Sequence, residues 1–134
     1  MKLATHISFG GNCEAAFKFY EKALGARIKF LTHFEGSPMA QGAPPELLNK
    51  VLHATLQVGD FELSGDDFPG DPKWQGFTLT LHTPDPAEAE RLFNALAEKG
   101  NITIPLKETF WAIAFGALTD QFGIPWMVNC EKPM

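Results

Sequence analysis

Apolar and polar residues alternate over several stretches in the first half of the chain, and this pattern predicts strands around one helix. Residues 3–9 alternate with a period of two, which is typical of a half-buried strand. Residues 14–24 carry apolar side chains at helical spacing, with Asn12 as the expected cap and Gly25 at the end. Further strands are predicted at residues 27–34, 51–58 and 61–64, and a loop at residues 35–49 separates the first of these from the other two.

The same order starts again after a polar segment, residues 65–76, which contains glycine and prolines and is predicted to be a linker. Asp85, Pro86 and Glu88 predict a capped helix start with a capping box, and Gly100 is expected to end that helix. Strands are predicted around this helix at 77–82, at two places within 102–118, and at 125–130. The pattern therefore predicts eight strands and two helices in a repeated β-α-β-β-β order.

Composition narrows the class of protein. The 134 residues suffice for a single domain, with module 1 at about 1–64 and module 2 at about 77–131. Eleven Lys and Arg residues against 16 Asp and Glu residues disfavour nucleic acid and anionic membranes as partners. No apolar run is long enough to cross a membrane, and the chain becomes polar before a signal-peptide core could form. We expect a cytoplasmic protein in which Cys13 and Cys130 are free thiols.

The repeated order and several motifs together resemble one superfamily. The motifs are Phe9-Gly10-Gly11-Asn12-Cys13-Glu14-Ala15, Phe19-Tyr20, Leu24-Gly25, His53-Ala54, Asp67, Glu108-Thr109-Phe110-Trp111, Phe115-Gly116, Asp120-Gln121-Phe122-Gly123 and Trp126-Met127-Val128-Asn129. They resemble the vicinal-oxygen-chelate superfamily, which includes glyoxalase I, bleomycin-resistance proteins and extradiol dioxygenases, and within it the PhnB-like subgroup. The resemblance implies an α+β, glyoxalase-like fold: two tandem β-α-β-β-β modules form a cupped eight-stranded mixed sheet, with the helices on its outer face. It also implies a ligand on the concave face, often one metal ion there, and a homodimer.

Alternation predicts which side chains face the cup. The apolar residues of each strand should face the helix, so the other set should face the ligand. That set is His6, Ser8, His53, Thr55, Gln57, Glu62, Ser64, Thr78, Thr80 and His82.

The resemblance also locates the metal ligands of the superfamily. In this chain they fall near Ala4 or Thr5, at Glu62, near Phe77 or Thr78, and at Met127. Of these, Glu62 alone has a side chain suited to a divalent ion, so we expect no metal cofactor. An alternative set, His6, His53 and Glu62, could hold one divalent ion if their strands are neighbours.

The second-half motif supplies aromatic and acidic candidates. Phe110 and Trp111 follow each other near a strand end, where neighbouring side chains point in opposite directions, so one could reach the ligand while the other packs. Glu108 is the candidate general base, because burial beside aromatic rings would raise its pKa. The alternative is that Glu108 is a solvated residue at the rim or pairs with a neighbour of Lys107. Trp126 alternates with Val128 and is expected in the core. Asp66 and Asp67 are expected to accept hydrogen bonds from linker amides.

Cys13 lies where a helix dipole can lower the pKa of a thiol, but no partner for nucleophilic catalysis is evident. The methyltransferase label often given to the PhnB-like subgroup lacks support, because the chain has no glycine-rich nucleotide loop.

Two functions follow from these expectations. The first is metal-free binding of a small organic molecule in the cup. The second is a metal-dependent lyase, isomerase or dioxygenase. The expected ligand-binding residues are His6, His53, Glu62, Thr78, Thr80, Phe110, Trp111 and Met127.

Overall fold

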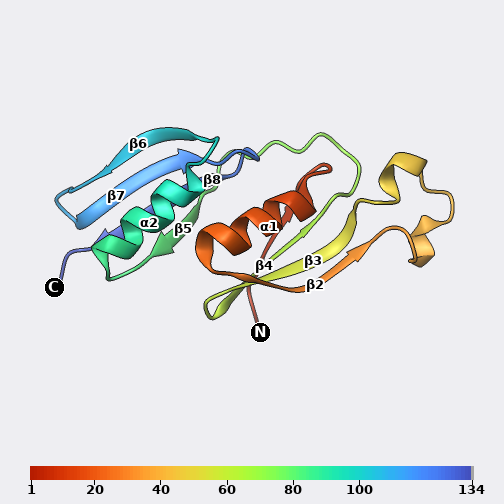
Figure 1. Ribbon diagram of the computed structural model, residues 1–134, viewed down its shortest axis with the longest axis horizontal. Coiled ribbons are helices and arrows are strands. Elements are labelled where there is room, and N and C mark those ends of the chain that lie inside the picture. Colours follow the sequence, from red (N-terminus) through yellow and green to blue (C-terminus); the bar gives the residue numbers. More distant parts are fainter. Residues whose placement is uncertain (134) are drawn as a thin grey trace. The chain divides into compact units, whose positions relative to one another are not determined.

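The computed structural model describes residues 1–133. It contains two compact units, and the division between them falls between Pro72 and Lys73, inside the predicted linker. Each unit consists of one four-stranded mixed sheet and one α-helix (Figure 1). The predicted α+β fold with two tandem modules is therefore confirmed, and its eight strands form two sheets of four.

Unit 1 has the predicted order of elements. They are β1 (Thr5–Ser8), α1 (Cys13–Leu24), β2 (Arg27–His33), β3 (Val51–Val58) and β4 (Phe61–Asp66). The strands are arranged β1-β4-β3-β2, with β1 parallel to β4 and the other pairs antiparallel. Two short 3-10 helices, Pro38–Ala40 and Pro45–Leu47, lie in the predicted loop between β2 and β3.

Unit 2 repeats this arrangement. Its elements are β5 (Leu79–His82), α2 (Pro86–Leu96), β6 (Asn101–Lys107), β7 (Ala112–Thr119) and β8 (Pro125–Glu131). The strand order β5-β8-β7-β6, with β5 parallel to β8, matches that of unit 1. The internal repeat that the sequence predicts is thus a repeat of topology as well as of element order.

The core of unit 1 lies between α1 and one face of its sheet. The buried face of α1 consists of Cys13, Ala16, Phe17, Tyr20 and Ala23. A Cβ atom on Gly65 of β4 would lie 3.0 Å from the Cys13 Sγ atom and 3.0 Å from the Phe17 ring, so glycine permits the helix to pack this closely. This packing occupies one face of the sheet.

The core of unit 2 is built in the same way. Ala89, Leu92, Phe93 and Leu96 form the buried face of α2, and a Cβ atom on Gly116 of β7 would lie 2.6 Å from the Phe93 ring. Trp126 is 3% exposed, which confirms its predicted place in the core. Its indole N–H donates a hydrogen bond to the buried Asp120 carboxylate (2.9 Å).

The start of α1 differs from the prediction. Asn12 makes no side-chain capping hydrogen bond; the carboxylate of Asp67 instead accepts from the amides of Gly11 (2.8 Å) and Cys13 (3.0 Å), and also from the amide of Val51 (3.0 Å). Asp67 therefore binds the turn before α1 to β3 rather than serving the linker. The linker itself begins later than predicted, because Gly65 and Asp66 belong to β4.

The ends of α2 also show corrections. Asp85 caps the helix as predicted, accepting from the Ala87 amide (3.0 Å). The capping box predicted a hydrogen bond from the Asp85 amide to the Glu88 carboxylate. The Thr83 hydroxyl lies between them instead: it accepts from the Asp85 amide and donates to Glu88. The helix ends at Leu96, before the expected Gly100, and Lys99 takes the left-handed conformation (φ 57°).

Two further expectations concern the helices and the thiols. In the described part of the chain, neither helix is long and apolar enough to span a membrane. Cys13 and Cys130 are both buried free thiols, as predicted. The expected lowering of the Cys13 pKa is wrong, because burial and the nearby carboxylates of Asp67, Asp66 and Glu14 raise it.

The substitution Asp67→Ala tests the carboxylate that connects α1 to β3. It removes the partner of three backbone amides, and each buried unpaired amide costs about 1–3 kcal/mol. We expect the free energy of unfolding, measured by denaturant titration, to fall by about 3 kcal/mol or more. The exposed control Asp71→Ala should change it by less than about 0.5 kcal/mol. A loss below about 1 kcal/mol for Asp67→Ala would contradict this role.

Candidate functional site

The sheet face of unit 1 opposite α1 carries the polar set that alternation predicts. The register places His6 beside Ser64 and Ser64 beside Thr55, across β1, β4 and β3. Gln57 pairs with Glu62 on the same face. Because the apolar residues of these strands pack against α1, the polar residues lie on the face that unit 1 leaves uncovered.

A hydrogen-bonded group occupies the β1–β4 edge of this face. The Nε2 atom of His6 lies 2.6 Å from one carboxylate oxygen of Asp66, and the Ser8 hydroxyl donates to the other (2.7 Å). The Phe68 amide also donates to Asp66 (3.1 Å). Burial raises the pKa of the Asp66 carboxyl, but the hydrogen bonds from His6, Ser8 and Phe68 outweigh it, and the pKa is lowered. Asp66 is thus a fully bonded carboxylate that orients His6.

His53 and an exposed aromatic ring extend this group across the sheet. The His6 and His53 rings are stacked, with centroids 5.8 Å apart. The Phe30 ring lies 6.0 Å from His53, and Phe30 is 51% exposed. The structure therefore brings together two of the predicted ligand-binding residues, His6 and His53.

Glu62 is held by two lysines rather than by the histidines. Lys2 and Lys29 each donate to one of its carboxylate oxygens, at 2.8 and 2.6 Å. These hydrogen bonds, with the lysine charges, lower the pKa of Glu62 to about 2. Within residues 1–133, no group of three or more His, Cys, Asp or Glu side chains could hold a metal ion. The alternative set of His6, His53 and Glu62 is therefore not assembled in this structure.

The sheet face of unit 2 opposite α2 shows two rows of residues across neighbouring strands. In one row Met127 of β8 pairs with Thr80 of β5 and with Ala117 of β7. In the next row Asn129 of β8 lies between His82 and Phe115. Met127 and Thr80 are thus neighbours, as the predicted ligand-binding set requires, whereas Thr78 lies before β5 and is exposed.

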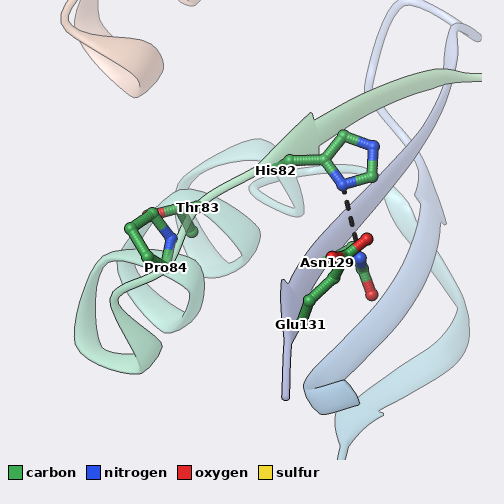
Figure 2. Close-up of a pocket in the computed structure, with 5 residues that line it drawn as sticks. All are labelled: His82, Thr83, Pro84, Asn129 and Glu131. Carbon is green, nitrogen blue, oxygen red and sulfur yellow. Dashed lines mark hydrogen bonds between the residues drawn. The ribbon is translucent and has the colours of Figure 1, made fainter. Parts of the chain in front are cut away.

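A cavity of about 480 Å³ opens beside the second row (Figure 2). Its lining residues are His82, Thr83, Pro84, Asn129 and Glu131. The side-chain amide nitrogen of Asn129 donates to the Nδ1 atom of His82 (3.3 Å). Asn129 is 6% exposed, and within residues 1–133 its Oδ1 atom accepts no hydrogen bond. Asn129 therefore lines the cavity, whereas its unsatisfied Oδ1 atom is itself buried.

Asn129 and Asp66 occupy corresponding positions in the two units. Asp66 pairs in register with Ser8, and Asn129 pairs with His82. In unit 1 the Phe9 amide donates to the backbone carbonyl of Asp66 (2.8 Å), and in unit 2 the Thr83 amide donates to that of Asn129 (3.1 Å). Both carboxylate oxygens of Asp66 are bonded within the chain. The repeat therefore places a closed polar network in unit 1 and an open one in unit 2.

Aromatic side chains flank the open network. The rings of Phe110 and Trp111 are in edge contact, with centroids 4.8 Å apart. The rings of Trp111 and Phe115 are also in edge contact, with centroids 5.2 Å apart. Phe110 is 90% exposed and Trp111 is 43% exposed. Both residues precede β7 and lie outside a strand, so the alternation from which their opposite orientations were predicted does not apply to them.

Glu108 lies outside the environment that was expected for a general base. Its side chain is 71% exposed and forms an ion pair with Lys132 (3.0 Å), so it lacks the burial on which that expectation depended. Its catalytic role stays a prediction.

Residues 4–128 match the sequence profile of the Glyoxalase/Bleomycin resistance protein/Dioxygenase superfamily. The chain belongs to this superfamily. Protein YjdN of Escherichia coli strain K12 is 35% identical over 142 residues, covering 98% of this chain and 97% of YjdN. The resemblance that the motifs indicate is confirmed.

Solved structures with a similar fold are known. The crystal structure of protein PA1353 from Pseudomonas aeruginosa is 40% identical, with a TM-score of 0.86 and 99% of each chain covered. The PhnB protein of Bacillus cereus is 23% identical, with a TM-score of 0.81, covering 96% of this chain and 98% of that protein. The second likeness concerns the fold alone.

Sequence reasoning missed the importance of Asn129 and Asp66. Asn129 alternates with Trp126, Val128 and Cys130 so as to face away from α2, a signal that the sequence does contain. The network of Asp66 depends on the parallel pairing of β1 with β4, which local patterns do not determine.

The substitution Lys29→Ala tests the electrostatics of Glu62. In the wild type we expect the Glu62 pKa to be about 2, below its ordinary value of 4.5. The contacts with the lysines therefore stabilise the fold fully above pH 4.5, and this stabilisation is lost as the pH falls toward 2. Without Lys29 the pKa should rise toward 4.5, measured by a side-chain carboxyl NMR titration. Added salt should shift it in the same direction. Lys22→Ala, at an exposed helix position, is the control, and a wild-type pKa near 4.5 would refute the arrangement.

Proposed function

We propose that this chain binds a small organic molecule on the sheet faces opposite its helices, without the metal ion of the superfamily. The observation that carries the proposal is the aromatic group Phe110, Trp111 and Phe115 beside the polar row of unit 2. Exposed aromatic side chains that gather next to a cavity are typical of a ligand site, because apolar contact supplies binding energy and a few polar groups fix the orientation.

The polar groups on these faces suit an uncharged or weakly charged organic ligand. In unit 1 the His6 and His53 rings and the exposed Phe30 ring offer stacking surfaces with nitrogen atoms at their edges. In unit 2 Thr80 and Met127 combine a hydroxyl with a flexible apolar side chain.

The donor chemistry supports binding without a metal. Both oxygens of Glu62 are bonded to lysines, so a divalent ion would have to displace two ammonium groups. Thr78 and Met127, at two of the other predicted positions, carry neither the imidazole nor the carboxylate that such ions favour in oxygen- and nitrogen-ligand sites. A metal-dependent lyase, isomerase or dioxygenase would need ligands from outside the predicted positions.

Binding of the neutral dye Nile red tests the proposal. We expect saturable binding at one site per chain, with enhanced dye fluorescence and partial quenching of tryptophan emission. Trp111→Ser should weaken the affinity by about tenfold, because an aromatic contact is lost. Phe61→Ser is the matched control, since Phe61 is an exposed aromatic residue at the β3–β4 turn.

Two results would contradict this proposal. One is Nile red binding that never saturates or that responds equally to Trp111→Ser and Phe61→Ser. The other is stoichiometric retention of added Fe, Ni, Zn or Mn that is lost in His53→Ala or Glu62→Ala. The second result would favour the metal-dependent enzyme.

We also propose that the chain forms a homodimer and acts in the cytoplasm, as the family resemblance and the composition led us to expect. Light scattering of the purified protein at micromolar concentration should give twice the chain mass of 14.8 kDa. A mass of one chain under these conditions would refute the dimer.

A further inference from the structure

We propose that the uncovered sheet face of unit 1 binds an aromatic molecule that carries a hydroxyl group, and that this hydroxyl donates a hydrogen bond to the Nδ1 atom of His6. This inference rests on the proposed ligand-binding function and names the chemical class of the ligand. The Nε2 atom of His6 is bonded to Asp66, whereas within residues 1–133 its Nδ1 atom has no hydrogen-bond partner. The His6 side chain is 46% exposed, so the ring is accessible to a ligand.

Asp66 determines which nitrogen of His6 carries the proton. Asp66 is 8% exposed, and its Oδ1 atom accepts from the Ser8 hydroxyl (2.7 Å) and the Phe68 amide (3.1 Å). Burial raises the pKa of the Asp66 carboxyl, but the hydrogen bonds from His6, Ser8 and Phe68 outweigh it, so the carboxyl is ionised near neutral pH. An ionised carboxylate can only accept hydrogen bonds. The Nε2 atom of His6 therefore donates to Asp66.

The other ring nitrogen is left as an acceptor. A neutral imidazole has one N–H donor and one acceptor nitrogen, so a proton on Nε2 gives Nδ1 a free lone pair. A carboxylate, an ether or a hydrocarbon has no proton to offer to this lone pair. The ligand group at His6 must therefore carry an O–H or N–H donor.

The charges on this face select a neutral donor rather than an ammonium group. The charged side chains along it include Lys2, Arg27, Lys29, Glu62 and Asp66. Three of these are cationic, and both carboxylates are already bonded within the chain. A cationic amine would therefore meet an excess of positive charge. A phenolic hydroxyl is neutral at pH 7, because its ordinary pKa is about 10, and it donates one hydrogen bond.

Two neighbouring rings suit the aromatic part of such a molecule. The His53 ring is stacked with the His6 ring, with centroids 5.8 Å apart and planes at 19° to each other. The Phe30 ring lies 6.0 Å from His53, and Phe30 is 51% exposed. Aromatic side chains that are grouped and exposed favour contact with another aromatic ring. A ligand bonded to His6 can thus place its ring against His53 and Phe30.

The corresponding positions of unit 2 lack an oriented imidazole. The register places Thr80 of β5 where unit 1 has His6, and Asn129 of β8 where unit 1 has Asp66. A hydroxyl and an amide can each donate and accept, so this pair does not present a fixed acceptor. Of the two units, unit 1 is therefore the one assigned to the hydroxyl group.

The probes 2-naphthol and 2-methoxynaphthalene test this assignment on the full-length protein, because they share an aromatic body and only the first has a hydroxyl. We expect His6→Phe to weaken 2-naphthol binding at least about fivefold in an NMR titration at about pH 8, where an ordinary imidazole is neutral. The same variant should leave 2-methoxynaphthalene binding unchanged within about twofold. His33→Phe is the matched control, since His33 bonds to Glu14 of α1 (2.8 Å) and should not affect either probe.

Nitrogen NMR of the histidine rings separates a positioning role of Asp66 from a structural one. In the wild type the His6 proton should reside on Nε2, and the Nδ1 signal should shift with 2-naphthol but not with 2-methoxynaphthalene. In Asp66→Asn the amide oxygen keeps the bonds from Ser8 and Phe68, so the amide nitrogen faces Nε2 as a donor and the proton moves to Nδ1. Binding of 2-naphthol should then weaken at least about fivefold. If Asp66→Asn fails to fold, the wild-type Nδ1 signal decides: a shift specific to 2-naphthol supports the proposal, and no shift overturns it.

Binding of 2-naphthol that is unchanged in His6→Phe, or an equal loss of both probes, would overturn the hydroxyl site. Nile red has no hydroxyl group, so Nile red binding that depends on Trp111 would still support the proposed function in that case. Loss of Nile red binding as well would overturn both.

Discussion

The packing of one helix against each four-stranded sheet is the constraint on which the rest of the structure depends. A helix can cover one face of a sheet, so the strands of each unit carry small or apolar residues toward α1 or α2 and polar residues on the other face. Glycines at Gly65 and Gly116 permit this close approach. The uncovered faces hold the histidines, threonines and Asn129, and this is why the site candidates lie there.

Local patterns predicted much of the fold. Alternation and helix-end signals located all eight strands and both helices, because burial on one face imposes a period that the sequence must show. The cap of α1 was missed because Asp67 reaches Gly11 and Cys13 across more than fifty residues. The orientations of Phe110 and Trp111 could not be deduced from alternation, because both residues lie between β6 and β7 rather than in a strand.

The candidate site was predictable in part. Alternation predicted that His6 and His53 face the same side, and their proximity depends on the strand order β1-β4-β3, which residue patterns alone do not determine. The lysine partners of Glu62 and the unsatisfied oxygen of Asn129 depend on side-chain placement, so neither could be deduced from the sequence. Corresponding positions in the two units thus acquired different chemistry, with a bonded carboxylate in one and an open amide in the other.

Backbone amide NMR during a titration with indole, a neutral aromatic molecule with one N–H donor, tests the ligand-binding account most directly. The account predicts saturable shifts at residues of β7 and β8 that face away from α2, centred on Phe115, Met127 and Asn129. Shifts confined to α2 or to the exposed β3–β4 turn, or no shifts at all, would contradict it.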